Sequence, residues 1–314
     1  MGGFLAHIKR LNQWDPEGFH PWWVDDERVG FLRSVLAERL LAFSEVFVSR
    51  RAGLTLAPDL VGFEDRTRAV HRVALSLVQD GLVEAPIGEW YSVTARDRGK
   101  ARLALDRAFA PAFGIRALGQ HLNGFVRRPE GLHLWVARRA AHRLHFPNRL
   151  DNLVAGGLPH GANFSDNLAK EGWEEASIPP ELMQSARPVG VITYCRETPA
   201  GLKPDTMYCY DLALPEDFTP SCNDGEVAAF HLWPATVPMG STAAGWCVIA
   251  TSNSVSSCHA PVSNSFTAPG PSNSPRPDPG TCCSFAGLAV RRSVMWGSTM
   301  ATEVLCMRPQ NTSR

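Results

Sequence analysis

Residues 165–176 are the segment that most restricts what this chain can fold into. At the helical step of about 100° per residue, Glu171, Glu174 and Glu175 fall on one face, and the apolar residues fall on another. Ser165 is the expected N-cap, and Asp166 suits the positive end of the helix. Three carboxylates on one face repel one another, a cost that a bound divalent cation would offset. The alternative interpretation is a solvated acidic face.

Strand-like segments flank this helix in the sequence. They cover residues 118–126, 132–138 and 150–155 before the helix, and residues 188–195, 206–212 and 226–233 after it. Strands around one central helix indicate a mixed sheet with helices packed against it. The predicted fold class is therefore α+β, with an α/β/α sandwich built on a mixed sheet.

The helix and the loop before it resemble the Nudix box. That motif reads Gly, five residues, Glu, seven residues, Arg-Glu, an aliphatic residue, any residue, Glu-Glu, any residue, Gly and an aliphatic residue. The matching positions are Gly156, Glu171, Glu174, Glu175 and Ile178. The departures are Ala162 for the first Glu, Lys170 for Arg, Gly172 for an aliphatic residue and Ser177 for the closing Gly. Lys170 keeps the charge of Arg but not its bidentate geometry.

Flanking segments are similar to one Nudix subfamily, which is related to the N-terminal half of fungal thiamine pyrophosphokinase. The segments that carry this resemblance are residues 119–126, 134–139, 150–159, 194–197 and 224–227. In that group the first glutamate of the box is often absent, and a helical domain precedes the Nudix domain. The resemblance extends from about Phe4 to Trp233.

The resemblance implies metal-dependent hydrolysis of a diphosphate linkage to a monophosphate and phosphate. It implies a small-molecule substrate, thiamine diphosphate or its oxidised forms. Mg²⁺ or Mn²⁺ would be held by Glu171, Glu174 and Glu175. The implied catalytic groups are Glu174, Glu175 and Glu226, and the implied substrate-binding groups are Arg138, Arg139 and Lys170.

Two alternatives to this function stay open at the level of the sequence. One is a catalytically weak or inactive Nudix protein that binds a ligand, which the departures inside the box favour. The other is a pyrophosphohydrolase of nucleoside-diphosphate-type substrates, which shares the chemistry but not the pocket.

The first 115 residues are expected to form a mainly helical accessory domain. Helical periodicity covers residues 29–47, 63–82 and 101–109, and residues 90–94 read as a strand. A winged-helix DNA-binding domain is the alternative, but the segment lacks a dense basic face. Lys+Arg and Asp+Glu both total 31, and this balance argues against binding driven by phosphate neutralisation.

The predicted division is an accessory domain at 1–115, a Nudix domain at 116–240 and a disordered or atypical tail at 241–314. Residues 251–280 are rich in Ser, Asn and Pro and are expected to be disordered. Residues 235–245 hold Pro238, Gly240 and Gly245, so the helix that usually closes a Nudix sheet is not expected there. The sequence has no apolar run of membrane-spanning length and no CxxC pair, and a cytoplasmic location is expected.

Overall fold

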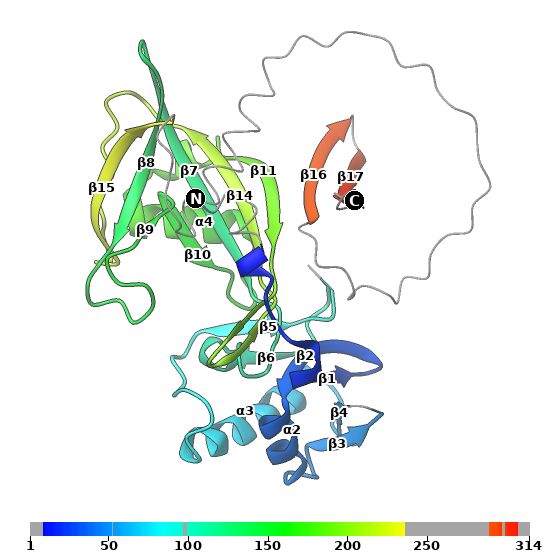
Figure 1. The fold of residues 1–314 in the computed structure, drawn as a ribbon. Helices are drawn as coiled ribbons and strands as arrows, with labels where there is room; N and C mark the ends of the chain where they lie inside the picture. Colours follow the sequence, from blue (N-terminus) through cyan, green and yellow to red (C-terminus); the bar gives the residue numbers. More distant parts are fainter. Residues whose placement is uncertain (1–8, 52, 97–98, 236–288, 297–298, 307–314) are drawn as a thin grey trace, which may run out of the picture.

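The computed structural model describes residues 9–51, 53–96, 99–235, 289–296 and 299–306. They form an N-terminal unit (residues 9–117) and a sheet unit (residues 118–235 with the two later strands), which lie at the bottom and top of Figure 1. The elements of the N-terminal unit are η1 (Pro16–Gly18), β1 (Phe19–Val24), β2 (Glu27–Arg33), α2 (Ser34–Leu41), β3 (Phe47–Arg50), β4 (Gly53–Leu56), α3 (Phe63–Gln79), β5 (Trp90–Val93), β6 (Leu103–Asp106) and η2 (Arg107–Phe109).

The N-terminal unit has its own aromatic core. Its strands form a sheet in the order β2-β1-β4-β3 and a separate β5-β6 pair. Trp22 is fully buried and packs edge-on against Phe47 and Phe113, with ring centroids 6.3 Å and 5.9 Å away. The Trp22 indole also donates a hydrogen bond of 2.8 Å to the carbonyl of Phe113. This bond satisfies the buried indole N–H.

The prediction of a mainly helical N-terminal domain is wrong. The expected helix at 63–82 is present as α3, and the expected strand at 90–94 as β5. However, the segment 29–47 is divided among β2, α2 and the start of β3, and the segment 101–109 is β6 followed by a 3-10 turn. Pairing decides these segments, because β2 pairs with β1 and β6 pairs with β5. Partners far along the chain override a local helical period. The winged-helix alternative depended on two helices followed by a short strand, and the first of these helices, at 29–47, is divided in this way.

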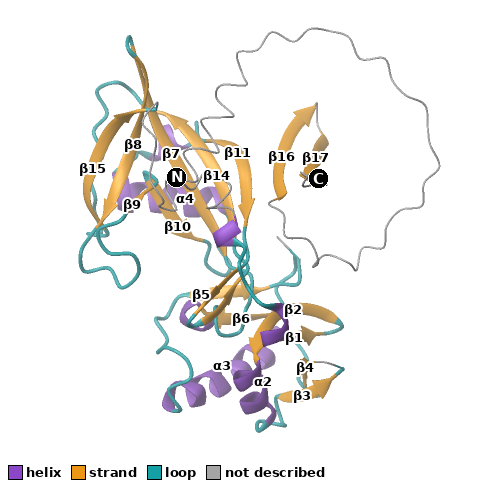
Figure 2. Ribbon diagram, in the orientation of Figure 1, coloured by secondary structure: helices purple, strands orange, loops and turns teal. Residues whose placement is uncertain are grey.

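The sheet unit contains the predicted helix between its strands. Its elements are β7 (Leu118–Arg128), β8 (Gly131–Arg139), β9 (Leu150–Asp151), β10 (Val154–Gly157), α4 (Phe164–Ala176), α5 (Pro180–Met183), β11 (Arg187–Thr193), β12 (Arg196–Thr198), β13 (Gly201–Lys203), β14 (Thr206–Ala213), β15 (Val227–Pro234), β16 (Ala289–Trp296) and β17 (Thr299–Cys306). The α+β class is confirmed, with strands outnumbering helices in both units (Figure 2).

The large sheet has the order β15-β8-β7-β14-β11-β16-β17, and β10 and β9 pair with β7 and β8. It is mixed, because β14 runs parallel to β7 and the other pairs run antiparallel. The predicted strand at 150–155 is split into β9 and β10. The β12-β13 hairpin was not predicted.

Helix α4 lies against one face of this sheet (Figure 1). Its apolar side joins a second core, which contains Leu122, Val126, Leu153, Val154, Leu168, Ile178 and Leu212. Burying this stripe fixes the orientation of the helix about its axis, so the directions of its glutamates are also fixed, and Glu175 lies on the buried side. The core thus decides where the carboxylates point.

The predicted tail lies mostly outside the described residues. Residues 251–280, expected to be disordered, are among those not described, as are residues 236–245, where the closing helix was not expected. Strands β16 and β17 are described, and β16 pairs with β11 at the edge of the large sheet. The tail prediction therefore stays a prediction.

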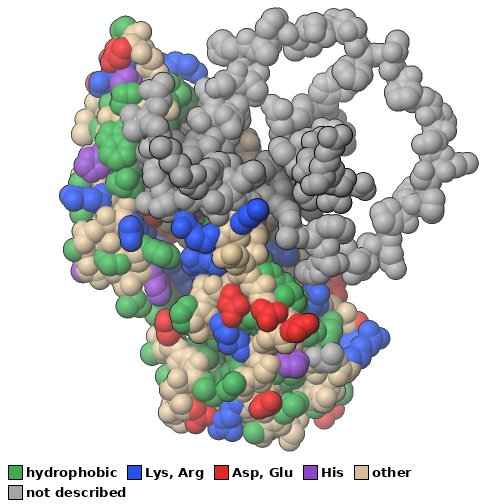
Figure 3. All heavy atoms as spheres, in the orientation of Figure 1, with side chains coloured by type: hydrophobic (Ala, Val, Ile, Leu, Met, Phe, Trp, Pro, Cys, Tyr) green, Lys and Arg blue, Asp and Glu red, His purple; other side chains and the backbone are tan. Residues whose placement is uncertain are grey.

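Among the described residues, helices long and apolar enough to cross a membrane are absent. On the face shown in Figure 3, acidic and basic side chains are interspersed over the N-terminal unit.

Candidate active site

The carboxylate helix begins one residue before the predicted range. Asn163, not Ser165, is the N-cap, and its side-chain oxygen accepts a hydrogen bond of 2.8 Å from the backbone N–H of Asp166. Ser165 is exposed inside the first turn, so its prediction as the cap is wrong. Asn and Ser are comparable caps, and the sequence offers both within three positions. Asp166 lies in the first turn, as predicted.

Glu171 and Glu175 are the two carboxylates of this helix that point inward. Glu175 is 5% exposed and accepts a hydrogen bond of 2.8 Å from the backbone N–H of Ala155 on β10. Burial raises the pKa of Glu175 well above its usual range, and the nearby Asp151 and Glu171 raise it further. Burial also raises the pKa of Glu171. Burial beside β10 thus disfavours the charged form of both carboxylates.

Gly156, the first residue of the Nudix-like motif, explains how Glu171 comes so close to β10. A Cβ atom on Gly156 would lie 2.5 Å from the carboxyl carbon of Glu171. A larger residue would therefore displace the carboxylate or the strand. The match at this position thus has a local steric reason.

Glu174 faces a different environment from its two neighbours. Lys170 lies 2.7 Å from a Glu174 oxygen and 3.4 Å from a Glu171 oxygen. These contacts raise the pKa of Lys170, chiefly through the hydrogen bond to Glu174. Lys170 therefore sits over the carboxylates, where it orients them.

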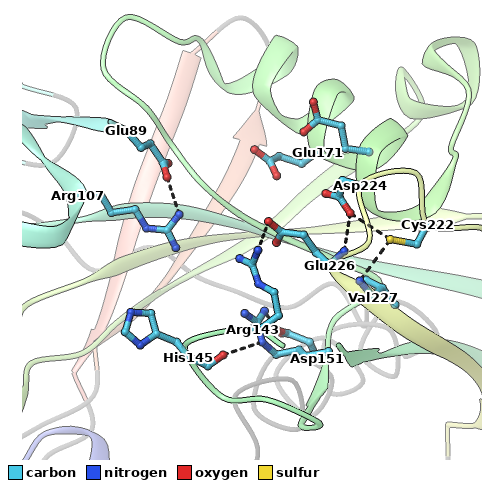
Figure 4. A network of polar contacts seen from close by, with 12 residues as sticks. Glu89, Arg107, Arg143, His145, Asp151, Glu171, Cys222, Asp224, Glu226 and Val227 are labelled. Atoms are coloured by element: carbon cyan, nitrogen blue, oxygen red, sulfur yellow. Dashed lines mark hydrogen bonds and ion pairs between the residues drawn. The ribbon is translucent and has the colours of Figure 1, made fainter. Parts of the chain in front are cut away.

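Strand β15 and the ends of β8 and β9 supply the other wall of the site. Glu226 lies directly before β15, and its carboxylate forms an ion pair with Arg143 (Figure 4). Arg139 lies 3.0 Å from Asp151. Glu226, Arg139 and Asp151 line a small enclosed cavity together with Glu175. The site is thus built from residues that are far apart in the sequence.

Arg138 and Arg139 point to opposite faces of β8, as the alternation of a strand requires. Arg139 is half-buried and lines the cavity, whereas Arg138 is exposed. The structure thus brings Arg139 together with Glu175 and Glu226, and leaves Arg138 outside.

The donor chemistry of the site fits a divalent cation. Glu171, Glu175, Asp151 and Glu226 offer hard carboxylate oxygens, which Mg²⁺ and Mn²⁺ prefer. In the described part of the chain, however, no three such side chains are already drawn together at ligand distance. Glu174 is turned toward Lys170, and Glu226 is turned toward Arg143. Metal binding by Glu171, Glu174 and Glu175 would require Glu174 to rotate toward the other two.

Two departures from the Nudix box have local structural reasons. A Cβ atom on Gly172 would lie 2.0 Å from the methyl carbon of Met183, so Gly172 allows α5 to pack on α4. Ser177 adopts the left-handed conformation (φ 52°, ψ 33°) that a closing Gly provides, and its hydroxyl donates a hydrogen bond of 2.7 Å to the carbonyl of Ser221.

Sequence reasoning missed residues of the N-terminal unit that face the same site. Arg107 and Glu89 form an ion pair of 2.6 Å on the side of the site opposite Glu171 (Figure 4). Tyr91 lies beside them, under the Arg107 guanidinium. These residues precede the motif by at least 49 positions (Gly156 minus Arg107). Nothing in their local sequence marks them.

Comparisons with known proteins match both units of the chain. A family model described as a domain of unknown function (DUF4743) matches residues 3–117. Two curated relatives from Arabidopsis thaliana are named Nudix hydrolase 20, chloroplastic, and Nudix hydrolase 24, chloroplastic. They are 37% identical over 245 residues and 36% identical over 238 residues. Each alignment covers 74% of this chain, and 66% and 65% of the respective relative.

A solved structure of a Deinococcus radiodurans protein also matches, with 23% identity and a TM-score of 0.34, covering 47% of this chain and 84% of the other. The alignments with the two curated relatives span most of this chain. These identities and the carboxylate helix behind Gly156 show that most of this chain is similar to Nudix hydrolases, and the chain spans just under two thirds of the length of these relatives.

Proposed function

We propose that this chain is a metal-dependent hydrolase that cleaves a diphosphate linkage in a small molecule. The observation that carries the proposal is the half-buried Glu171 and the buried Glu175 on one helix, with Glu175 and Glu226 lining the same small cavity. A protein does not bury several carboxylates together for stability alone, because each loses its hydration. A bound metal ion would compensate the negative charge of these carboxylates and would bind the phosphate oxygens of a substrate.

The role of each side chain in this reaction follows from its position in the site. Glu171, Glu174 and Glu175 would hold Mg²⁺ or Mn²⁺, which supplies positive charge to the transferring phosphoryl group when bound. The oxygen of a water molecule forms a bond to phosphorus, and the bridging P–O bond breaks with its electron pair on the leaving monophosphate. The proton of the water passes to Glu226, which Arg143 holds in place. Arg139 lies close enough to meet a phosphate oxygen.

Thiamine diphosphate or one of its oxidised forms is the substrate that we propose. Its support is the resemblance of the flanking segments to the thiamine pyrophosphokinase-related group. Hydrolysis would release the monophosphate and phosphate. Nucleoside-diphosphate-type compounds share the reactive linkage and are the second candidate class.

Phosphate release tests this function. Purified full-length protein is incubated with Mg²⁺ or Mn²⁺ and with thiamine diphosphate, its oxidised forms, ADP-ribose or nucleoside diphosphates. We expect turnover that a chelator abolishes. Glu175→Gln keeps an acceptor for the Ala155 N–H but removes the charge, so kcat should fall by about 100-fold or more while the fold is retained.

Glu181→Gln is the matched control, since Glu181 is an exposed glutamate on the neighbouring helix α5. Its turnover should equal that of the unmodified protein. Absence of hydrolysis across the whole panel, with thermal shifts showing that a diphosphate still binds, would instead support the ligand-binding alternative. Equal turnover in Glu175→Gln and Glu181→Gln would refute the assignment of the metal-binding helix.

A further inference from the structure

The N-terminal unit reaches the carboxylate site through β5 and the turn η2. Glu89 directly precedes β5, and Arg107 begins η2. In Figure 4 their side chains lie across the site from Glu171 and from the Glu226–Arg143 pair. The charges of Arg107 and Glu226 are close enough to interact, as are those of Glu89 and Glu171. Two units with separate cores thus meet at one polar site.

Arg107 is held in place by several contacts within its own unit. Its backbone N–H donates a hydrogen bond of 2.7 Å to the carbonyl of Glu89, and its guanidinium lies 2.6 Å from the Glu89 carboxylate. Asp106, 1% exposed, accepts hydrogen bonds from the backbone N–H groups of Gly88 (2.7 Å) and Ala108 (2.9 Å). The guanidinium also lies over the ring of Tyr91, 5.9 Å from its centroid. Such restraint lowers the entropy that a ligand contact would cost.

Tyr91 lies between the Glu89–Arg107 pair and the sheet unit, and its contact with Gly157 sets their separation. A Cβ atom on Gly157 would lie 2.1 Å from the Tyr91 hydroxyl oxygen and 3.4 Å from a Glu89 oxygen. Gly157 is adjacent to Gly156, which lies against Glu171. The N-terminal side chains therefore pack directly on the strand that faces the carboxylate helix.

Among the cations near the site, Arg107 is the one best placed to receive a ligand. Arg139 and Arg143 are each paired with a carboxylate of the site wall, Asp151 and Glu226. Glu89 contacts Arg107 at Nη1, and 41% of the Arg107 side chain is exposed to solvent. A guanidinium that is anchored on one nitrogen and open to solvent suits bidentate recognition of phosphate.

We propose that Arg107 binds a phosphate oxygen of the diphosphate substrate, so that the N-terminal unit completes the active site of the sheet unit. Glu89 is a positioning residue that aims the guanidinium. This inference rests on the proposed function for the identity of the substrate. It explains why a unit with its own core is packed against the carboxylate helix at Gly157.

The test compares Arg107→Met and Arg107→Lys with Arg39→Met in the full chain. Arg39 is a matched control, because its side chain is also 41% exposed and is paired with a carboxylate, Asp80, at 2.8 Å. Half-exposed ion pairs contribute little to stability, so all three variants should fold. Binding of methylenediphosphonate, a diphosphate that cannot be hydrolysed, is measured by calorimetry with Mg²⁺ present. KM and kcat are measured in parallel on the best substrate of the panel.

We expect Arg107→Met to weaken methylenediphosphonate binding and to raise KM by about 10-fold or more, because a charge-assisted bidentate contact is lost. Arg107→Lys should recover part of the loss, and Arg39→Met should match the unmodified protein. Unchanged Kd and KM in Arg107→Met would overturn this inference and leave the proposed function standing. Failure of the unmodified protein to bind methylenediphosphonate would also overturn it. Weaker binding in Arg107→Met without turnover in any variant would reject the proposed hydrolysis alone.

Discussion

At the scale of single residues, a polar chain crosses the interior of the large sheet. The Asn123 side-chain amide donates a hydrogen bond of 2.8 Å to Asp211, and the Asn152 amide donates one of 2.7 Å to Asn123. Asp211 is 9% exposed, and burial raises the pKa of its carboxyl above the ordinary 3.8. The charged form is thus disfavoured in the folded state.

This burial predicts a pH-dependent effect of Asp211→Asn. A carboxyl whose folded-state pKa is raised contributes its full stability below about pH 3.8 and loses it as the pH rises through the folded-state value. The asparagine oxygen can still accept the Asn123 hydrogen bond, so the variant should be more stable at pH 7.5, by up to about 1 kcal/mol. Urea midpoints at pH 7.5 and 4.5 should show the advantage shrinking on acidification. Asp217→Asn, at an exposed position, should show no such trend.

The individual site residues could be predicted only where a local pattern marks them. Helical spacing and the motif together gave Glu171, Glu174 and Glu175, and strand alternation showed that one of Arg138 and Arg139 must point away. Which glutamate is buried depends on how closely α4 packs against β10. That packing is set by tertiary contacts, which a local sequence pattern does not show. Glu89 and Arg107 depend on the docking of two units, which local sequence does not encode.

At the scale of elements, the C-terminus of α4 combines backbone strain with a hydrogen bond. The Ser177 N–H donates to the carbonyl of Trp173 at 3.1 Å, and the Ile178 N–H donates to that of Gly172 at 3.0 Å. This arrangement needs a left-handed residue, and a side chain there costs about 1 kcal/mol relative to glycine. The hydrogen bond from the Ser177 hydroxyl to Ser221, worth about as much, offsets that cost.

Two substitutions separate these contributions. Ser177→Ala keeps the strain and loses the hydroxyl bond, so it should destabilise the protein by about 1 kcal/mol. Ser177→Gly loses both, so its net effect should stay within about 0.5 kcal/mol. Urea unfolding of both variants measures the difference. Equal destabilisation by the two would mean that the left-handed backbone carries no strain here.

Among the elements, those with a clear period were predictable and those set by distant pairing were not. Helices α3 and α4 carry an apolar stripe, and the main strands alternate or are rich in β-formers, so their positions followed from the sequence. Strand β2 and helix α2 adjoin without a break, and the apolar residues of both happen to fit one helical period. Pairing with β1 breaks that period at Ser34.

At the scale of the whole molecule, the hairpin β12-β13 links the sheet unit to the N-terminal unit. Arg33 forms an ion pair of 2.9 Å with Glu197, and the Leu202 N–H donates a hydrogen bond of 2.9 Å to the carbonyl of Pro111. Leu202 is fully buried. Since the proposed site draws side chains from both units, this junction should matter for activity as well as for stability.

Gly201 is the most sensitive point of that junction. Its φ of 135° is one that residues with a side chain rarely adopt, and a Cβ atom there would lie 2.1 Å from the carbonyl oxygen of Pro111. Because that neighbour is backbone, it cannot rotate away as a side chain would. Gly201→Ala should therefore cost about 3 kcal/mol, from the strained backbone and the displaced contact together.

For a chain of this size, that cost corresponds to a fall in melting temperature of roughly 6–12 °C. Gly190→Ala is the control, because a Cβ atom on Gly190 would meet no atom within 4 Å among the described residues. Differential scanning calorimetry should show one transition that Gly201→Ala shifts as a whole, since the hairpin couples the two cores. If instead Gly201→Ala splits the transition and leaves the upper component at its original temperature, the two units unfold independently. In that case the hairpin holds Arg107 near the carboxylate helix without stabilising either core.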